Sequence, residues 1–224
     1  MKYFYTQMST IKQSNYSHFD NLWKFYDIKD WKHSHQDDSP NPQYLIQDGK
    51  LTLFTRANSR DKQKMRTISN HFTSGTYTWK AKIPELITSE QVSIGCFIYC
   101  DDHHELDFEI GYGKETKRAE IKVAPDELIA YMTCQDFPFV SGCAPIKPGW
   151  HDFAIQLDLE DGKYVASWII DGQLKQKKKL EFGTEISFII FCSVENLKFI
   201  GDEIPKNDTY GIFDCVSFKG QINK

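Results

Sequence analysis

Short segments in which apolar and polar residues alternate recur along most of this chain. Successive side chains of a β-strand point to opposite faces, so this pattern predicts strands with one buried face. The strands expected from it cover residues 44–46, 51–55, 75–83, 92–99, 104–110, 118–123, 151–159, 164–170, 174–180, 186–194 and 211–218. A spacing of roughly 8–12 residues is typical of all-β sandwiches. The pattern therefore predicts an all-β fold, a β-sandwich of two packed antiparallel sheets.

Asp-Gly dipeptides separate several neighbouring strands of this set. They are Asp48-Gly49, Asp161-Gly162 and Asp171-Gly172. Asp-Gly between two alternating runs is a strong signal for a tight β-hairpin, because both residues tolerate positive φ. We therefore expect three hairpins at these positions.

The remaining segments show weaker patterns. Residues 1–40 are polar with interspersed aromatics, and we expect an irregular N-terminal segment packed on the domain. Residues 57–66 are charged and are interpreted as a loop, and residues 125–132 are the only stretch with helical character. No repeat, low-complexity tract or linker divides the chain, so a single domain over residues 1–224 is expected.

Composition excludes several classes of protein. Of 224 residues, 40% are hydrophobic and 26% are charged, which is typical of a globular chain. No apolar run reaches the ~18 residues of a membrane-spanning helix, so no membrane partner is expected. The net charge is −4, and the only dense basic run is Lys177-Lys178-Lys179. Nucleic-acid binding needs a basic face, so nucleic acid is not expected as a partner.

The N-terminus and the cysteines leave the compartment open. The first residues lack the apolar core of a signal peptide, which is compatible with a cytoplasmic protein or with a signal already removed. No Cys-x-x-Cys pair suggests zinc. Cys96 and Cys100 are ~13 Å apart along one strand, too far for a disulfide. Cys134 and Cys143 could pair in an oxidising compartment, although buried free thiols are favoured.

The most informative motif is a strand with three acidic residues. Glu105, Asp107 and Glu109 alternate with apolar residues, so the three carboxylates share one face and the apolar residues face the core. A solvent-exposed polar face would explain this alternation. However, three like charges without an interleaved Lys or Arg repel each other, which also suggests a functional cluster.

Paired carboxylates are the groups that glycoside hydrolysis needs. One carboxylic acid protonates the leaving oxygen and one carboxylate acts at the anomeric carbon, with ~5–5.5 Å between them for retention of configuration. The Cα atoms of Glu105 and Glu109 are ~13 Å apart along a strand, but side chains leaning inward on a concave sheet can approach this separation. Asp107, between them, can share a proton with Glu105.

The order Glu-Leu-Asp-Phe-Glu resembles the Glu-x-Asp-x-Glu signature of glycoside hydrolase family 16. Four other segments resemble strands of that family in the right order, namely residues 72–83, 149–155, 168–172 and 212–218. The resemblance covers roughly residues 44–220. It implies a concanavalin A-like β-jelly roll in which the acidic strand lies in a concave cleft.

The resemblance also implies the chemistry. Glu105 would be the nucleophile, Asp107 would assist it, and Glu109 would be the general acid/base of a double-displacement mechanism. The substrate would be a β-linked polysaccharide or oligosaccharide of glucan or galactan type, bound by a monomer in an extracellular or periplasmic compartment. No cofactor is expected, although the family allows a structural calcium ion.

Several residues are candidates for the sugar-binding surface. In the stretch before the signature, where the family often has Trp, only Phe97 is aromatic here, and Thr78 stands where the family often has Glu. The expected substrate-binding residues are Trp79, Phe97, His104, Phe137 and Phe139, with Tyr99 and Tyr112 as further aromatic candidates. Core packing is the alternative role for each aromatic residue. A carbohydrate-binding module and a structural sandwich without a groove remain the alternative functions.

Overall fold

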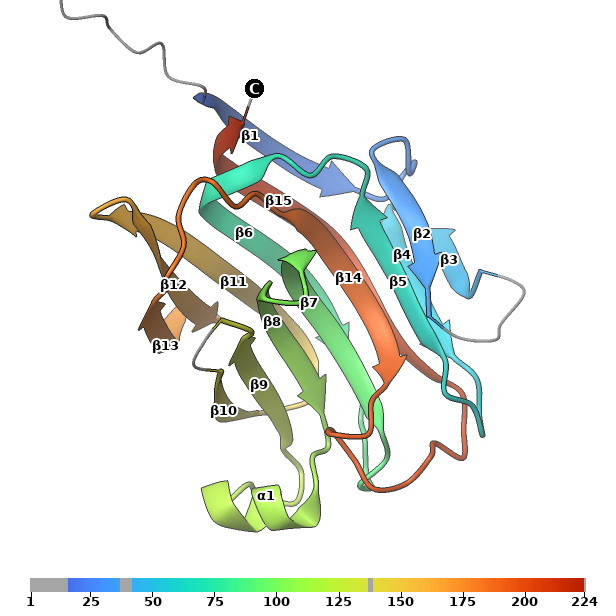
Figure 1. Ribbon diagram of the computed structural model, residues 1–224. Helices are drawn as coiled ribbons and strands as arrows, with labels where there is room; N and C mark the ends of the chain where they lie inside the picture. Colours follow the sequence, from blue (N-terminus) through green and yellow to red (C-terminus); the bar gives the residue numbers. More distant parts are fainter. Residues whose placement is uncertain (1–15, 37–41, 137–138, 224) are drawn as a thin grey trace, which may run out of the picture.

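Two antiparallel sheets pack face to face in the computed structural model, which describes residues 16–36, 42–136 and 139–223 (Figure 1). Sheet A has the strand order β13-β12-β11-β6-β15-β4-β3, and β1 also pairs with β15. Its strands are β1 (Tyr16–Lys24), β3 (Tyr44–Gln47), β4 (Lys50–Thr55), β6 (Phe72–Ile83), β11 (Gly149–Glu160), β12 (Lys163–Ile170), β13 (Gln173–Lys179) and β15 (Thr209–Asn223).

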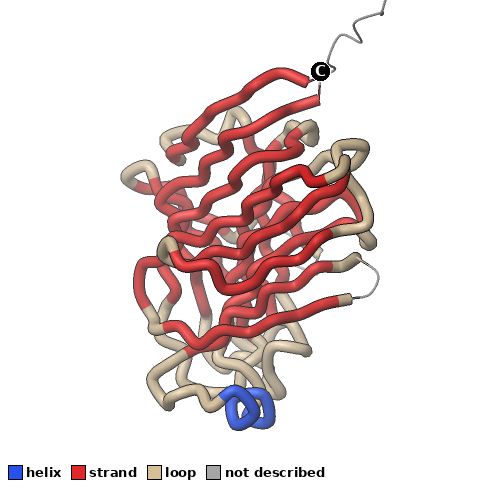
Figure 2. Tube along the Cα trace, turned by 90° about the vertical axis from the view of Figure 1, so that its left-hand side faces the viewer, coloured by secondary structure: helices blue, strands red, loops and turns tan. Residues whose placement is uncertain are grey.

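Sheet B has the strand order β10-β9-β8-β7-β14-β5-β2. Its strands are β2 (Trp31–His35), β5 (Lys62–Thr67), β7 (Val92–Asp101), β8 (His104–Gly111), β9 (Leu128–Cys134), β10 (Val140–Ile146) and β14 (Ile189–Asn196). Within the described residues one helix, α1 (Glu115–Ile121), lies at one end of the sandwich (Figure 2). The predicted all-β sandwich is confirmed.

The three predicted Asp-Gly hairpins are present. Asp48, Asp161 and Asp171 have φ between 51° and 53°, and the glycines that follow them also have positive φ. Two consecutive residues with positive φ match the twist of the flanking strands, which is why Asp-Gly specifies this turn. These turns connect β3 to β4, β11 to β12 and β12 to β13.

Several local predictions are wrong. The N-terminal segment is not irregular where it is described, because β1 pairs along β15 and β2 pairs along β5. The expected loop at 57–66 contains the start of strand β5, and the weakly helical stretch at 125–132 leads into strand β9. In each case pairing with a distant strand supplies the backbone hydrogen bonds, and local composition does not reveal this.

Most of the predicted strand at 118–123 belongs to helix α1 instead. Arg118 is buried, and its guanidinium donates hydrogen bonds of 2.7–2.8 Å to the carbonyl oxygens of Tyr112, Ala124 and Glu127. It also lies 3.8 Å from the centre of the Tyr112 ring. This tertiary anchor fixes the turn that closes the β8–β9 connection, and Lys122 ends the helix in a left-handed conformation.

The core between the sheets contains two tryptophans of sheet A that reach the backbone of sheet B. The indole Nε1 of Trp79 donates to the carbonyl oxygen of Phe191 at 2.8 Å, and that of Trp168 donates to the carbonyl oxygen of Asp107 at 2.9 Å. Both indoles are fully buried. They join β6 to β14 and β12 to β8, so they fix how the two layers sit on each other.

No helix among the described residues is long and apolar enough to cross a bilayer. All six cysteines lie within the described residues, and each is a free thiol. Cys134 and Cys143 do not pair, because in the β9–β10 register Cys134 lies opposite Val140 and Cys143 lies opposite Tyr131.

Candidate active site

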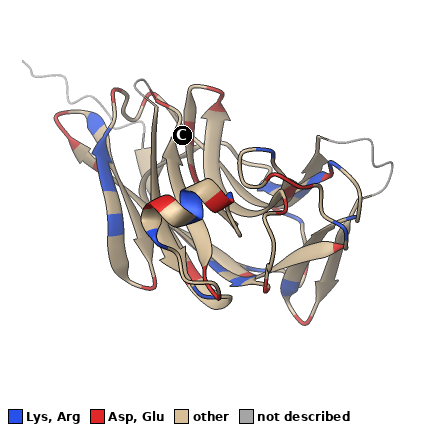
Figure 3. Ribbon diagram, turned by 90° about the horizontal axis from the view of Figure 1, so that it is seen from below, with Lys and Arg blue, Asp and Glu red and all other residues tan. Residues whose placement is uncertain are grey.

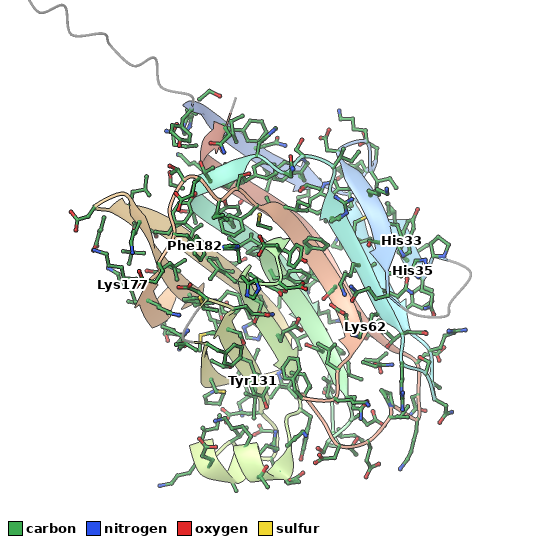
Figure 4. The ribbon with its side chains drawn as sticks, in the orientation of Figure 1. His33, His35, Lys62, Tyr131, Lys177 and Phe182 are labelled. Atoms are coloured by element: carbon green, nitrogen blue, oxygen red, sulfur yellow. The ribbon has the colours of Figure 1, made fainter. Side chains whose placement is uncertain are left out.

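The acidic strand β8 lies near the middle of sheet B, with its two faces as predicted. Leu106, Phe108 and Ile110 are fully buried in the core. Glu105, Asp107 and Glu109 point to the outer face, where they line a groove of about 740 Å³. Residues from β2, β5, β7, β9, β10 and β14 complete the lining, so the groove crosses most of the sheet. Two of its residues, Tyr131 on the β9 side and Lys62 on the β5 side, are labelled in Figure 4.

The carboxylates are withdrawn from bulk solvent. Asp107 is 4% exposed and Glu109 is 7% exposed. A strand that merely presented a solvated polar face would leave these groups in water, so that alternative is wrong. Burial of an ionised carboxylate is costly unless it is paired or protonated, and functional sites are where such costs concentrate.

Glu105 lies at the open end of the acidic strand. Its Oε2 accepts a hydrogen bond of 2.7 Å from the Nε2 of Gln135 on the neighbouring chain segment. Burial, reinforced by the negative charge of Glu195, raises the pKa of Glu105 to about 7. The nearby ammonium of Lys64 acts in the opposite direction. At neutral pH this group therefore exists in both protonation states.

Asp107 occupies the centre of the groove floor. Its neighbours in register are Phe97 on β7 and Thr133 on β9. Burial and the adjacent Glu105 raise its pKa well above the usual range, although hydrogen bonds from Thr133 oppose the shift. Its Oδ1 is buried and has no hydrogen-bond partner among the described residues. The protonated form of Asp107 is therefore favoured.

Glu109 is the buried acid at the inner end of the strand. Its Oε2 accepts a hydrogen bond from the hydroxyl of Ser93 on β7. Burial raises its pKa well above the usual range, with Glu195 and Asp107 acting in the same direction. Its register neighbour on β7 is Gly95, whose missing side chain leaves space for the carboxylate. The protonated form of Glu109 is therefore favoured.

A fourth carboxylate, missed by the sequence analysis, faces the same groove. Glu195 of β14 is buried and forms an ion pair with Lys64 of β5, with side-chain exposures of 5% and 12%. The sequence contains a signal for the strand that carries its partner Lys64. Lys62, Lys64 and Arg66 alternate with buried residues, as in a half-buried strand, within the segment interpreted as a loop. Only the strand order shows that Glu195 faces Glu105 and Glu109.

Aromatic rings form a platform beside the acids. Phe97 lines the groove as predicted, and its ring stacks on that of Phe191 with centroids 4.6 Å apart and an interplanar angle of 7°. Tyr99 meets Phe191 edge-on at 6.1 Å. Phe139 lines the β10 side and is 63% exposed. Phe137 lies outside the described residues.

Other predicted binding residues are not in the groove. Trp79 is a core residue, because alternation along β6 turns it inward and β6 belongs to sheet A. His104 lies two positions from Leu106 in β8 and so belongs to the face opposite Glu105. Its ring packs against Phe182 and contacts the carboxylate of Asp101 at 2.7 Å. Tyr112 packs against Arg118 at α1.

Metal binding at 101–105 was not favoured from the sequence. Within the described parts of the chain, no three or more His, Cys, Asp or Glu side chains are grouped so that they could hold a metal ion. Asp101 and His104 contact each other and are exposed to different extents at the tip of the β7–β8 turn.

At the level of sequence, no family model and no curated protein matches the chain. Solved structures do match over nearly its full length. The catalytic domain of a laminarinase (endo-1,3-β-glucanase) from Thermotoga petrophila has a TM-score of 0.65 and 12% identity, covering 91% of this chain and 99% of that one. A β-1,3-1,4-glucanase (lichenase) from a mouse hindgut metagenome has a TM-score of 0.60 and 14% identity, covering 90% and 98%.

A third similar structure contains a bound sugar. LamA from Zobellia galactanivorans, solved with laminaritriose and laminaritetraose, has a TM-score of 0.60 and 14% identity, covering 92% of this chain and 97% of that one. These likenesses confirm that the chain has the jelly-roll fold of these β-glucanases. The four segments that carried the resemblance lie in β6, β11, β12 and β15, which are adjacent strands of sheet A.

Proposed function

We propose that this protein is a retaining glycoside hydrolase that cleaves a β-linked polysaccharide of glucan or galactan class. The observation that carries the proposal is the placement of Glu105, Asp107 and Glu109 on one strand, where they line a groove with Asp107 and Glu109 buried and Glu105 half-buried. The fold shared with laminarinases and lichenases supports it. A binding module would not need three mutually repelling carboxyl groups in this position.

In the first step, the carboxylate of Glu105 attacks the anomeric carbon. The glycosidic C–O bond breaks as the new ester bond forms, and the proton of Glu109 passes to the leaving oxygen. The raised pKa of Glu109 favours the protonated form that this step requires. Burial raises the pKa of Glu105 to about 7, so its carboxylate form is present at neutral pH.

In the second step, a water molecule attacks the same anomeric carbon. Glu109, now a carboxylate, accepts a proton from the water, and the ester bond to Glu105 breaks. Asp107 favours the protonated state and can donate a hydrogen bond toward Glu105, which stabilises the departing carboxylate. The Phe97–Phe191 pair offers an apolar face beside the acids on which a sugar ring can stack.

The direct test is hydrolysis of laminarin, lichenan, agarose, carrageenan and xyloglucan by the wild-type protein and by Glu105→Gln and Glu109→Gln. Both variants should lose activity by several orders of magnitude and remain folded. Glu160→Gln, an exposed acid at the end of β11 in sheet A, is the matched control and should keep full activity. Oligosaccharide binding without product release by the wild type would instead identify a carbohydrate-binding protein.

A second experiment separates the two roles. With an activated β-aryl glycoside and azide, Glu105→Ala should yield the inverted glycosyl azide, because azide replaces the protein nucleophile. Glu109→Ala should yield the retained azide, because azide intercepts the glycosyl-enzyme. The reverse pattern would exchange the roles of the two residues.

A further inference from the structure

The groove has a basic end that the proposed chemistry does not use. Lys62, Lys64 and Arg66 alternate along β5 and line the groove, three strands away from the acidic strand β8. At ~4.8 Å between neighbouring strands, this stripe lies ~14 Å from the acids. Lys64 is neutralised by Glu195. The acidic centre and the basic end are thus separate features of one groove.

Among the residues that the structure describes, Arg66 has no acidic partner at this end. Its Nη1 donates to the carbonyl oxygen of Thr67 at 3.2 Å, and no ion pair joins it to a carboxylate within the described parts of the chain. The residue directly opposite Arg66 on the edge strand β2 is Lys32, which is exposed and likewise has no ion pair within those parts. Paired residues of adjacent strands point to the same face, so both cations lie on the groove side.

Like charges directly opposite each other destabilise a sheet. Here the Lys32–Arg66 pair is flanked by Lys64 in the next position of β5 on the same face. Ser34 of β2 and Gln36, which follows β2, also line the groove and are neutral polar residues. An anion placed over the pair would relieve the repulsion and accept charge-assisted hydrogen bonds from the guanidinium. The arrangement is therefore complementary to a sulfate or carboxylate group.

The platform between the two ends indicates how such an anion would be presented. Asp107, Phe97, Phe191 and Arg66 are successive partners across β8, β7, β14 and β5. A sugar chain laid across these strands, with one bond at the acids, would pass over the phenylalanine pair and place a ring a few units further on above Arg66.

We propose that the β2–β5 end of the groove, through Arg66 and Lys32, binds an anionic substituent of the polysaccharide, either a sulfate ester or a sugar carboxylate. This inference rests on the proposed function and specifies its substrate class. Neutral polysaccharide would fill the acidic centre and the aromatic platform, whereas the anionic chain would also engage the basic end.

Binding measured without turnover tests the proposal. Glu105→Gln protein is titrated by calorimetry with neutral, sulfated and carboxylated oligosaccharides of the same β-linked backbone, at low and high salt. We expect about tenfold tighter binding of an anionic form at low salt. The advantage should shrink at high salt, because ions screen the partly exposed cations. The tighter of the two anionic forms identifies the source of the charge.

Variants localise the effect. Arg66→Gln, added to the Glu105→Gln protein, should abolish the preference for the anionic oligosaccharide and leave binding of the neutral one unchanged. Arg66→Lys should retain part of the preference. Lys177→Gln is the control, because Lys177 is an exposed lysine of β13, the edge strand of the other sheet. The basic residues of β13 appear as blue bands in Figure 3, and Figure 4 shows Lys177 on the far side of the molecule from Lys62.

The outcomes separate the two proposals. Equal binding of neutral and anionic chains, or equal weakening of both by Arg66→Gln, would overturn the anionic subsite even if the wild type hydrolyses neutral glucan. Selective, Arg66-dependent binding of an anionic chain would support it. If the wild type then failed to cleave that chain, the proposed hydrolase activity would be wrong and the anion site would stand.

Discussion

Gly95 lies beside Glu109 in the register of β7 and β8, and the missing side chain is what makes room for the buried carboxylate. A Cβ at position 95 would lie 2.2 Å from the hydroxyl oxygen of Ser193 and 3.3 Å from both carboxylate oxygens of Glu109. The position of the proposed acid/base thus depends on a residue that carries no chemistry of its own.

Gly95→Ala should therefore destabilise the protein by about 1–3 kcal/mol, the usual cost of overpacking a tight site, and reduce hydrolysis. Ser193→Ala removes the closest clashing atom. The Ser193 hydroxyl is buried without a hydrogen-bond partner among the described residues, so this change should be harmless alone. Urea unfolding of the double variant should recover most of the lost stability. Simple additivity of the two changes would contradict the proposed clash.

The raised pKa of Glu105 predicts that stability falls as pH rises. Its pKa is about 7 in the folded protein against an ordinary 4.5, so between these values the folded state holds a proton that the unfolded chain releases. The stabilisation is complete below about pH 4.5 and is lost as pH rises through 7. Asp107 and Glu109 act in the same direction, because burial also raises their pKa values.

Glu105→Gln should remove about 2–3 kcal/mol of the decline in unfolding free energy between pH 5 and pH 8. Denaturant unfolding at both pH values measures this. Above pH 5 the Asp61 carboxyl, whose pKa is lowered mainly by its hydrogen bond from Arg56, stays ionised and does not interfere. The Glu160→Gln control should keep the wild-type slope, and an unchanged slope in Glu105→Gln would refute the burial argument.

The Lys64–Glu195 ion pair should tune the acids of β8. The charge of Glu195 raises the pKa values of Glu105 and Glu109, after burial, so Glu195→Gln should lower both and shift the pH–rate profile to lower pH. Lys64→Met should shift it the other way. The carboxyl carbon resonances of labelled Glu follow the same titrations without reference to activity. Shifts of the same sign in both variants would argue against electrostatic tuning.

Lys64→Met should also cost stability. It leaves Glu195 buried and unpaired, and breaking a buried ion pair on one side costs about 3–5 kcal/mol. Replacing both partners, with Glu195→Gln, should cost clearly less, because no buried charge is then left alone. Thermal unfolding of the single and double variants gives the comparison.

Two hydrogen bonds from β12 to backbone carbonyls allow a matched test of groove support. The Trp168 indole donates to the carbonyl oxygen of Asp107, whereas the Tyr164 hydroxyl donates to that of Ile186 at 3.0 Å, away from the groove. Trp168→Phe and Tyr164→Phe should each cost about 1–3 kcal/mol of stability. Only Trp168→Phe should also lower kcat, since it alone supports the acidic strand. Equal kinetics in the two variants would show that Trp168 is merely a core residue.

The sequence by itself determined the fold class, most strands and the face of the acidic residues. Side-chain parity is fixed by the period of a strand, so Glu105, Asp107 and Glu109 had to share the face opposite Leu106 and Phe108. The Asp-Gly turns were equally local, because they depend only on which residues tolerate positive φ. These features needed no knowledge of distant residues.

Strand order across the sheet was decided only by the tertiary structure. Pairing between β14 and β5 brings Glu195 to Lys64, 131 positions apart in the chain, and no local pattern encodes that meeting. The sequence showed that Trp79 lies in an alternating strand but not which sheet that strand belongs to. It also did not reveal strands β1, β2 and β5, because their hydrogen bonds come from partners far along the sequence. The face of a side chain depends on its own strand alone, whereas the groove depends on the pairing order of the seven strands of sheet B.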